Sequence, residues 1–96
     1  MRIVDHLIEP AIIPLATRTD AMTAIELGKA SGIYPNGSIA SWSDLGRYLG
    51  AMLVETGLAV RFGRLPVRYE ATERGKIAAA LYVGKASRRR AQEDRR

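Results

Sequence analysis

The 96-residue sequence contains no cysteine, and this absence removes three kinds of site at once. A disulfide framework, a thiolate zinc site and a cysteine nucleophile all require that side chain. The chain also has a single histidine, His6, with no second histidine or cysteine that could share a metal ion. We therefore expect no metal site and no cofactor.

Recognisable catalytic sets are missing as well. A nucleophile–base–acid arrangement would depend on His6, because there is no other histidine. No carboxylate pair and no glycine-rich phosphate loop stands in a recognisable context, and the GKAS segments at 28–31 and 84–87 lack the upstream glycine of a P-loop. The sequence therefore predicts a protein that is not an enzyme.

Long hydrophobic runs are also absent. The apolar start, MRIVDHLIEPAIIPLA, is interrupted by Asp5, His6, Glu9 and two prolines. A signal peptide needs a basic start and an unbroken apolar stretch, and a membrane span needs about 20 apolar residues. We expect a cytoplasmic protein without a membrane partner.

What the sequence does have is positive charge, concentrated toward its C-terminal end. The net charge is +5, and 47% of the residues are apolar, which suits one small domain with a modest core. Residues 1–40 carry three basic and four acidic residues, whereas residues 72–96 carry eight basic and three acidic residues. This distribution indicates a polyanionic partner, and a basic tail that merely aids solubility explains it equally well.

The first 19 residues are apolar at helical spacing, but Pro10 and Pro14 interrupt a regular helix. They predict two short helical pieces or one kinked element. A helix follows, with Asp20 or Thr23 as its N-cap, and Glu26 completes a capping box with Thr23. It ends at Gly32, and GIYPNGSIAS is a loop.

The clearest predicted helix spans residues 41–56, with Ser41 as its N-cap and Gly57 as its stop. Its apolar residues have the spacing of a buried face. We assign to the core Leu45, Tyr48, Leu49, Met52 and Leu53. The outward positions are then Ser43, Gly46, Arg47 and Gly50. The two glycines either let a nucleic-acid backbone or another helix approach closely, or relieve crowding in the core.

Two strand-like runs, 58–62 and 67–71, are joined by a Gly-Arg-Leu-Pro turn. Pairing Phe62 with Val67 places every apolar residue on one face of this hairpin. The same register sets Arg61 directly opposite Arg68 on the second strand. Two like charges in this arrangement destabilise a sheet by at most about 1 kcal/mol. Either the arginines are simply solvated, or a phosphate group between them relieves the repulsion.

The last predicted helix opens at Thr72 and Glu73, and Ile77 and Leu81 form its buried stripe. From residue 87 the sequence reads SRRRAQEDRR, which predicts a charged helix end or a disordered tail.

These elements together resemble a winged helix-turn-helix domain. The resemblance is carried by the segments ETGL and YEATERGK around a basic hairpin. Members commonly have a Gly-Leu pair before the first wing strand and Tyr-x-x-Thr-x-x-Gly after the second. The matching residues here are Gly57, Leu58, Tyr69, Thr72 and Gly75. The loop between the two helices is longer than the family's usual turn.

The resemblance covers about residues 20–86. An apolar N-terminal element (1–19), which is a candidate surface for dimerisation, precedes this region, and a basic tail (87–96) follows it. It implies an α+β fold with a helical core, a two-stranded antiparallel β-wing and a C-terminal helix. The helix at 41–56 would enter the DNA major groove, and the wing at 58–71 would contact the flanking backbone or minor groove.

By the same resemblance, Arg47 is the best candidate for a base contact, since arginine to guanine is the commonest specific pairing. Candidate phosphate contacts are Ser38, Ser41 and Ser43. Trp42 either stacks on a sugar or base or closes the core over the loop. The wing contributes Arg61, Arg64 and Arg68.

The predicted function is sequence-specific binding of double-stranded DNA by a homodimeric transcriptional regulator. Pairing would use the N-terminal element and the last helix, where Ala78, Ala79 and Ala80 permit close contact between helices. Two alternatives stay open. One is a winged-helix protein–protein adaptor or inhibitor of the phage or plasmid type, and the other is a non-specific nucleic-acid binder.

Overall fold

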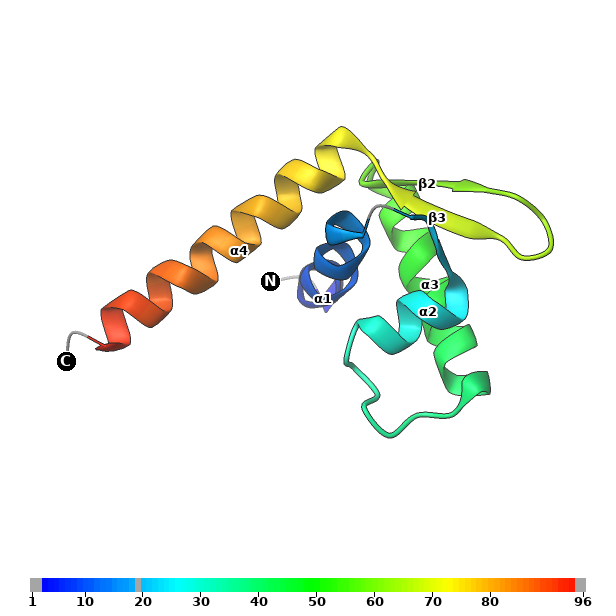
Figure 1. Cartoon of the computed structure of the whole chain (residues 1–96), viewed down its shortest axis with the longest axis horizontal. Helices are drawn as coiled ribbons and strands as arrows, with labels where there is room; N and C mark the ends of the chain where they lie inside the picture. The colour runs from blue at the N-terminus through cyan, green and yellow to red at the C-terminus, as the bar shows by residue number, and fades with distance from the viewer. Residues whose placement is uncertain (1–2, 19, 95–96) are drawn as a thin grey trace.

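The computed structural model describes residues 3–18 and 20–94, and within them the chain forms an α+β domain of four helices and one three-stranded antiparallel sheet (Figure 1). The elements are α1 (Ile3–Thr17), β1 (Met22–Thr23), α2 (Ala24–Ala30), α3 (Ile39–Glu55), β2 (Ala59–Phe62), β3 (Arg68–Ala71) and α4 (Glu73–Asp94). The predicted α+β class is confirmed, and the element order is compatible with a winged-helix topology. Residues 1, 2, 19, 95 and 96, which belong to the predicted N-terminal element and basic tail, lie outside the described residues.

α1 is a single helix that contains both prolines, so of the two predicted forms the chain forms one element and not two separate pieces. Pro10 and Pro14 lie inside it, and each removes one backbone hydrogen bond. Tertiary packing compensates for this loss, because Ala11, Ile12 and Leu15 are all buried in the core. The N-terminal element is therefore one of the walls of the core.

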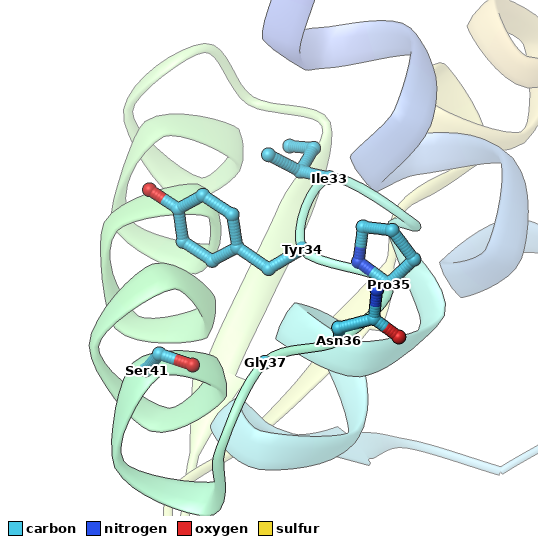
Figure 2. A pocket seen from close by; sticks show the side chains of 6 residues that line it. All are labelled: Ile33, Tyr34, Pro35, Asn36, Gly37 and Ser41. Atoms are coloured by element: carbon cyan, nitrogen blue, oxygen red, sulfur yellow. The ribbon is translucent and has the colours of Figure 1, made fainter.

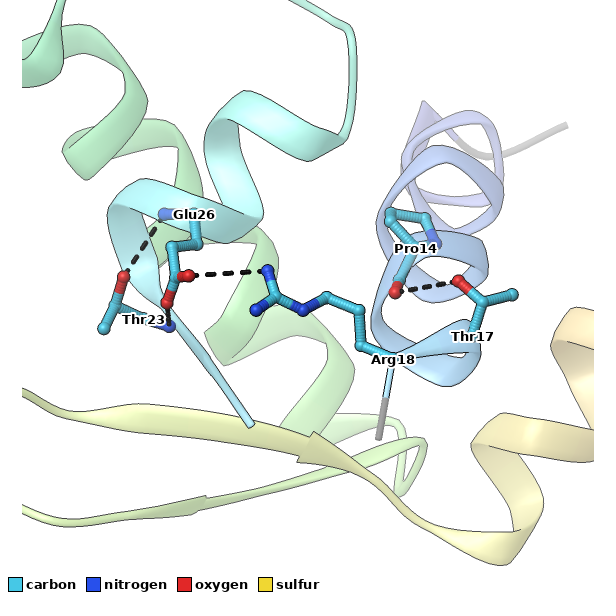
Figure 3. A network of polar contacts seen from close by, with 5 residues as sticks. All are labelled: Pro14, Thr17, Arg18, Thr23 and Glu26. Carbon is cyan, nitrogen blue, oxygen red and sulfur yellow. Dashed lines mark hydrogen bonds and ion pairs between the residues drawn. The ribbon is translucent and has the colours of Figure 1, made fainter. Parts of the chain in front are cut away.

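A polar network holds the segment between α1 and α2 (Figure 3). The Glu26 backbone N–H donates to Thr23 Oγ1 at 3.3 Å, and the Thr23 N–H donates to Glu26 Oε1 at 3.0 Å. This is the predicted capping box, with Thr23 rather than Asp20 as the N-cap. Arg18 reaches the other carboxylate oxygen at 3.4 Å. The backbone hydrogen bond from Thr23, aided by the charge of Arg18, lowers the pKa of Glu26.

α3 begins at Ile39, earlier than the predicted start at Ser41. Its N-cap is Ser38, and Ser41 is the third helical residue of a reciprocal capping box. The serine pair at 38 and 41 thus satisfies the first turn, and Ser38 takes the place of Ser41 as the N-cap.

Two glycines form part of the buried face of α3, so their assignment to the outward face is wrong. A Cβ at Gly46 would overlap the backbone of Ala24 at the start of α2, and a Cβ at Gly50 would overlap the ring of Tyr69. The glycines therefore let α2 and the sheet approach α3 closely. Tyr48, predicted to be in the core, is 55% exposed instead.

The sheet has the order β1-β3-β2, and its hairpin is paired one residue away from the predicted register. Arg61 lies opposite Tyr69, and Phe62 lies opposite Arg68, so the two arginines do not face each other. Val60 and Phe62 consequently lie on the outer face and are exposed. The inner face carries Ala59, Tyr69 and Ala71, which are buried. The short strand β1 was not predicted.

Packing against the helices selects this register. The Tyr69 ring lies against Gly50 of α3, while the small side chains of Ala59 and Ala71 let the neighbouring helices approach. Five residues, 63–67, connect the strands, so Val67 belongs to the connection and not to β3.

The two segments that carry the family resemblance meet in space. Thr72 Oγ1 donates to the Gly57 carbonyl at 2.8 Å and accepts from the Gly75 N–H at 3.1 Å. The Thr72 N–H donates to the Leu58 carbonyl at 3.0 Å, and a Cβ at Gly75 would overlap that same carbonyl. Thr72 therefore joins the end of α3 to the start of α4.

α4 buries a face that was not predicted. Gly75 and Ala79 are buried and Tyr82 is half-buried, whereas Ile77 and Leu81 are exposed. This inner face packs against α1, and its small residues Gly75 and Ala79 let the two helices lie close together. The helix continues to Asp94, in agreement with the charged helix end rather than the disordered tail. Within the described residues, no helix combines the length and apolar character needed to cross a bilayer.

Candidate nucleic-acid interface

A hollow of about 470 Å³ lies between α3, the start of α2 and the β2–β3 hairpin. Strand β1 contributes Thr23, the helices contribute Ala24, Ile25, Ser43 and Arg47, and the hairpin contributes Arg61, Leu65, Pro66, Val67 and Tyr69. The charged side chains in this lining are both arginines, Arg47 and Arg61. We call this hollow the basic groove, because its walls suit an anionic ligand that also offers apolar surface.

Arg47 lies on the exposed side of α3 and is held by its own helix. Its Nη2 donates to Asp44 Oδ1 at 3.0 Å and to Ser43 Oγ at 3.3 Å, and its Nε donates to the Ser43 carbonyl at 3.4 Å. Both members of the ion pair with Asp44 are well exposed. Such surface pairs contribute little stability, so the guanidinium can exchange these partners for a ligand.

The three hairpin arginines point to different surroundings. Arg61 lines the basic groove on the same sheet face as Tyr69, and Arg68 lies on the outer face opposite Phe62. Arg64 is in the connection between the strands, residues 63–67. All three are exposed. A ligand in the groove therefore meets Arg61 directly, while Arg64 is outside the groove lining.

Ser38, the N-cap, and Ser41 and Trp42 lie at the N-terminal end of α3, beside the loop at 31–38. The Ser38 N–H donates to Ser41 Oγ at 2.8 Å, and the Ser41 N–H donates to Ser38 Oγ at 3.2 Å. The serine hydroxyls are therefore engaged in capping. Trp42 donates from Nε1 to the Tyr34 carbonyl at 2.9 Å, which agrees with its closing the core over the loop.

A second hollow, of about 420 Å³, lies at this loop (Figure 2). Its lining is Ile33, Tyr34, Pro35, Asn36, Gly37 and Ser41. None of these six residues is charged, so this hollow has no electrostatic attraction for a polyanion. Lys29 lies nearby, with its Nζ 5.3 Å from the centre of the Trp42 ring.

Sequence reasoning missed Tyr48, the apolar part of the groove and the contribution of α2. Tyr48 lies on the exposed side of α3, together with Asp44, Arg47, Ala51 and Glu55. The buried stripe of Gly46, Leu49, Gly50 and Leu53 has the spacing i, i+3, i+4, i+7. Counting the glycines as buried would have revealed this stripe, and with it the exposure of Tyr48.

Within the part of the chain that the structure describes, no three His, Asp or Glu side chains come close enough to hold a metal ion. Comparisons of the chain with protein-family models, curated proteins and solved structures found no match. Function is therefore inferred from the residues and geometry of the basic groove.

Proposed function

We propose that the chain is a sequence-specific, double-stranded DNA-binding transcriptional regulator of the winged helix-turn-helix type. α3 is its recognition helix and enters the major groove, and the β2–β3 hairpin is its wing on the flanking backbone or minor groove. One observation carries the proposal: Arg47 of α3 and Arg61 of the hairpin line the same groove, with no acidic residue in its lining.

The exposed side of α3 supports base reading. Arg47 offers a guanidinium that can pair with guanine, and Tyr48 offers an exposed aromatic ring beside it. Arg61, Arg64 and Arg68 supply phosphate contacts, which position the protein without reading sequence. Ser43 remains a candidate phosphate contact because it lines the groove.

Homodimerisation is part of the proposal. Ile77 and Leu81 are 60% and 58% exposed on the side of α4 that faces away from α1. One recognition helix gives a limited affinity for DNA. In a dimer the second helix binds its half-site in an intramolecular step, so the affinity for a paired site is much higher. α4 is accordingly the pairing surface.

A protein–protein adaptor is the second candidate, and one observation favours it. Val60 and Phe62 are exposed on the outer face of the hairpin, where they form an apolar surface outside the core. A partner protein that covers this face would explain their exposure.

Selection of duplexes from a random DNA pool, followed by competition across a salt series, tests the proposal. We expect a selected duplex to resist competitor DNA, and simultaneous replacement of Arg61, Arg64 and Arg68 by alanine to abolish binding. Lys76→Ala removes one exposed positive charge that lies outside the groove and outside the stripe of Ile77 and Leu81, and is the control. Equal affinity for all duplexes would indicate a non-specific binder. Absence of duplex binding, or binding unaffected by the triple replacement, would contradict the proposal.

A further inference from the structure

We propose that Leu65, at the hairpin tip, is an apolar wedge that enters the minor groove between two base pairs and kinks the duplex. This inference rests on the proposed DNA-binding function. It concerns how the hairpin engages DNA and adds a specificity determinant to the arginine contacts.

The exposure of Leu65 is the first observation. Its side chain is 99% exposed, the highest value among the large hydrophobic residues whose exposure the structure describes. It makes no packing contribution to the fold at this exposure. Single exposed apolar residues are common on protein surfaces, so the argument needs the surroundings of Leu65 as well.

The surroundings are cationic and face the DNA side of the molecule. Leu65 follows the exposed Arg64 directly and lines the basic groove together with Arg47 and Arg61. A polyanion bound along these arginines therefore passes beside the Leu65 side chain. This charge complementarity selects DNA over an uncharged apolar partner for the hairpin tip.

The minor groove accommodates this combination of residues. Proteins that bind there insert Leu, Ile, Phe, Met or Pro between base steps, partly unstack the bases and bend the duplex toward the major groove. A narrow minor groove also attracts arginine through its negative potential. Arg64 and Leu65 are adjacent at the tip, and Pro66, which also lines the groove, follows them.

A wedge at this position would recognise DNA sequence through the ease with which a base-pair step is deformed. Pyrimidine–purine steps such as TA and CA are easily unstacked, so the protein would prefer such a step where the hairpin tip lands. That preference arises without a hydrogen bond to a base. It would therefore persist when Arg47 is replaced.

The test uses the full chain and a duplex selected by it from a random pool. Dyes at the two ends report bending by energy transfer, and 2-aminopurine at each adenine in turn reports unstacking by its fluorescence. For the wild type we expect a bend and raised fluorescence at one pyrimidine–purine step. Leu65→Ala should lose both signals. Its affinity should fall by at most about tenfold, because the arginine contacts to phosphate remain. Leu65→Met keeps a flexible apolar side chain and should retain both signals.

The possible failures are distinguishable. If no duplex binds the wild type, the proposed function fails and the wedge fails with it. If the wild type binds a selected duplex without bending or unstacking it, only the wedge is overturned. Persistence of the kink in Leu65→Ala would likewise overturn the wedge.

Discussion

Arg47 combines exposure, charge and a place on the proposed recognition helix. Its neighbours Ser43 and Asp44 orient the guanidinium along α3 without burying it. Arg47→Ala should therefore flatten base preference at one position of the site, by about 1–3 kcal/mol, while other positions stay discriminated. Competition among single-base variants of the selected duplex measures this. Unchanged preference at every position would show that Arg47 does not read a base.

Gly46 illustrates a residue whose role depends on its neighbour. In an isolated helix, Gly46→Ala should stabilise by about 1 kcal/mol. Here the added Cβ would overlap the backbone of Ala24, so α2 and α3 would have to separate. We expect net destabilisation of roughly 1–3 kcal/mol, measured as the free energy of unfolding in urea.

Ala51→Gly is the control for Gly46→Ala. Ala51 is exposed on the same helix, so its replacement changes helix propensity without disturbing packing. It should cost about 1 kcal/mol. A stabilising effect of Gly46→Ala would contradict the close approach of α2 to α3.

At the scale of elements, the hairpin places its arginines in different surroundings. Arg61 belongs to the groove and Arg68 to the outer face, so Arg64 is the arginine at the tip. Arg64→Ala should lower affinity for every duplex alike and reduce the slope of log affinity against log salt by about one. Titration at several salt concentrations measures this, with Lys76→Ala as control. A loss confined to one sequence would assign Arg64 to base reading instead.

The junction of α1 and α2 should respond to acid. The folded state lowers the pKa of Glu26 below its ordinary value, through the Thr23 backbone hydrogen bond and the charge of Arg18. The unfolded chain therefore binds this proton at a higher pH than the folded chain does. The contribution of Glu26 to stability is present above its unfolded pKa and is lost as pH falls through the lowered folded value.

Glu26→Gln tests this linkage. The variant should be less stable than the wild type at neutral pH, and the difference should shrink toward about pH 3. Urea unfolding of the wild type and the variant, at neutral pH and at about pH 3, measures the difference in their free energies of unfolding at each pH. Arg18→Ala should show a smaller effect of the same sign, because the Arg18–Glu26 pair is partly exposed. A difference that is independent of pH would contradict the assigned role of the carboxylate.

At the scale of the whole molecule, the hairpin tip and the far end of α4 lie at opposite ends (Figure 1). A dimer paired through α4 would therefore leave both hairpins free. Leu81→Glu should convert a dimer into a monomer in sedimentation, because it places a charge in the exposed apolar stripe of Ile77 and Leu81 on α4. Binding to a paired site should fall by about 10²- to 10⁴-fold, with single-site binding retained.

The fold control for Leu81→Glu is its unfolding free energy, which should change little since the side chain is largely exposed. A wild-type chain that sediments as a monomer at tens of micromolar would remove the dimer from the proposal.

The sequence by itself determined the features that depend on neighbours along the chain. The Thr23–Glu26 capping box forms as expected, and α2 and α3 are followed by Gly32 and Gly57 with φ of 72° and 79°. The exposure of Arg47 also followed from helical spacing. Each of these needs only a few consecutive residues, because caps and helical turns are local.

Only the tertiary structure decided which faces are buried. Hydrophobicity favoured Phe62 and Ile77 for the core, yet Tyr69 against Gly50 selected the hairpin register and the close approach of α1 selected the small face of α4. The site depended on the same packing, since it set Arg61 in the groove beside Arg47 and left Leu65 exposed at the tip. A residue's partner across space is not encoded by its spacing along the chain, and close packing rewards the shape that fits rather than the most apolar side chain.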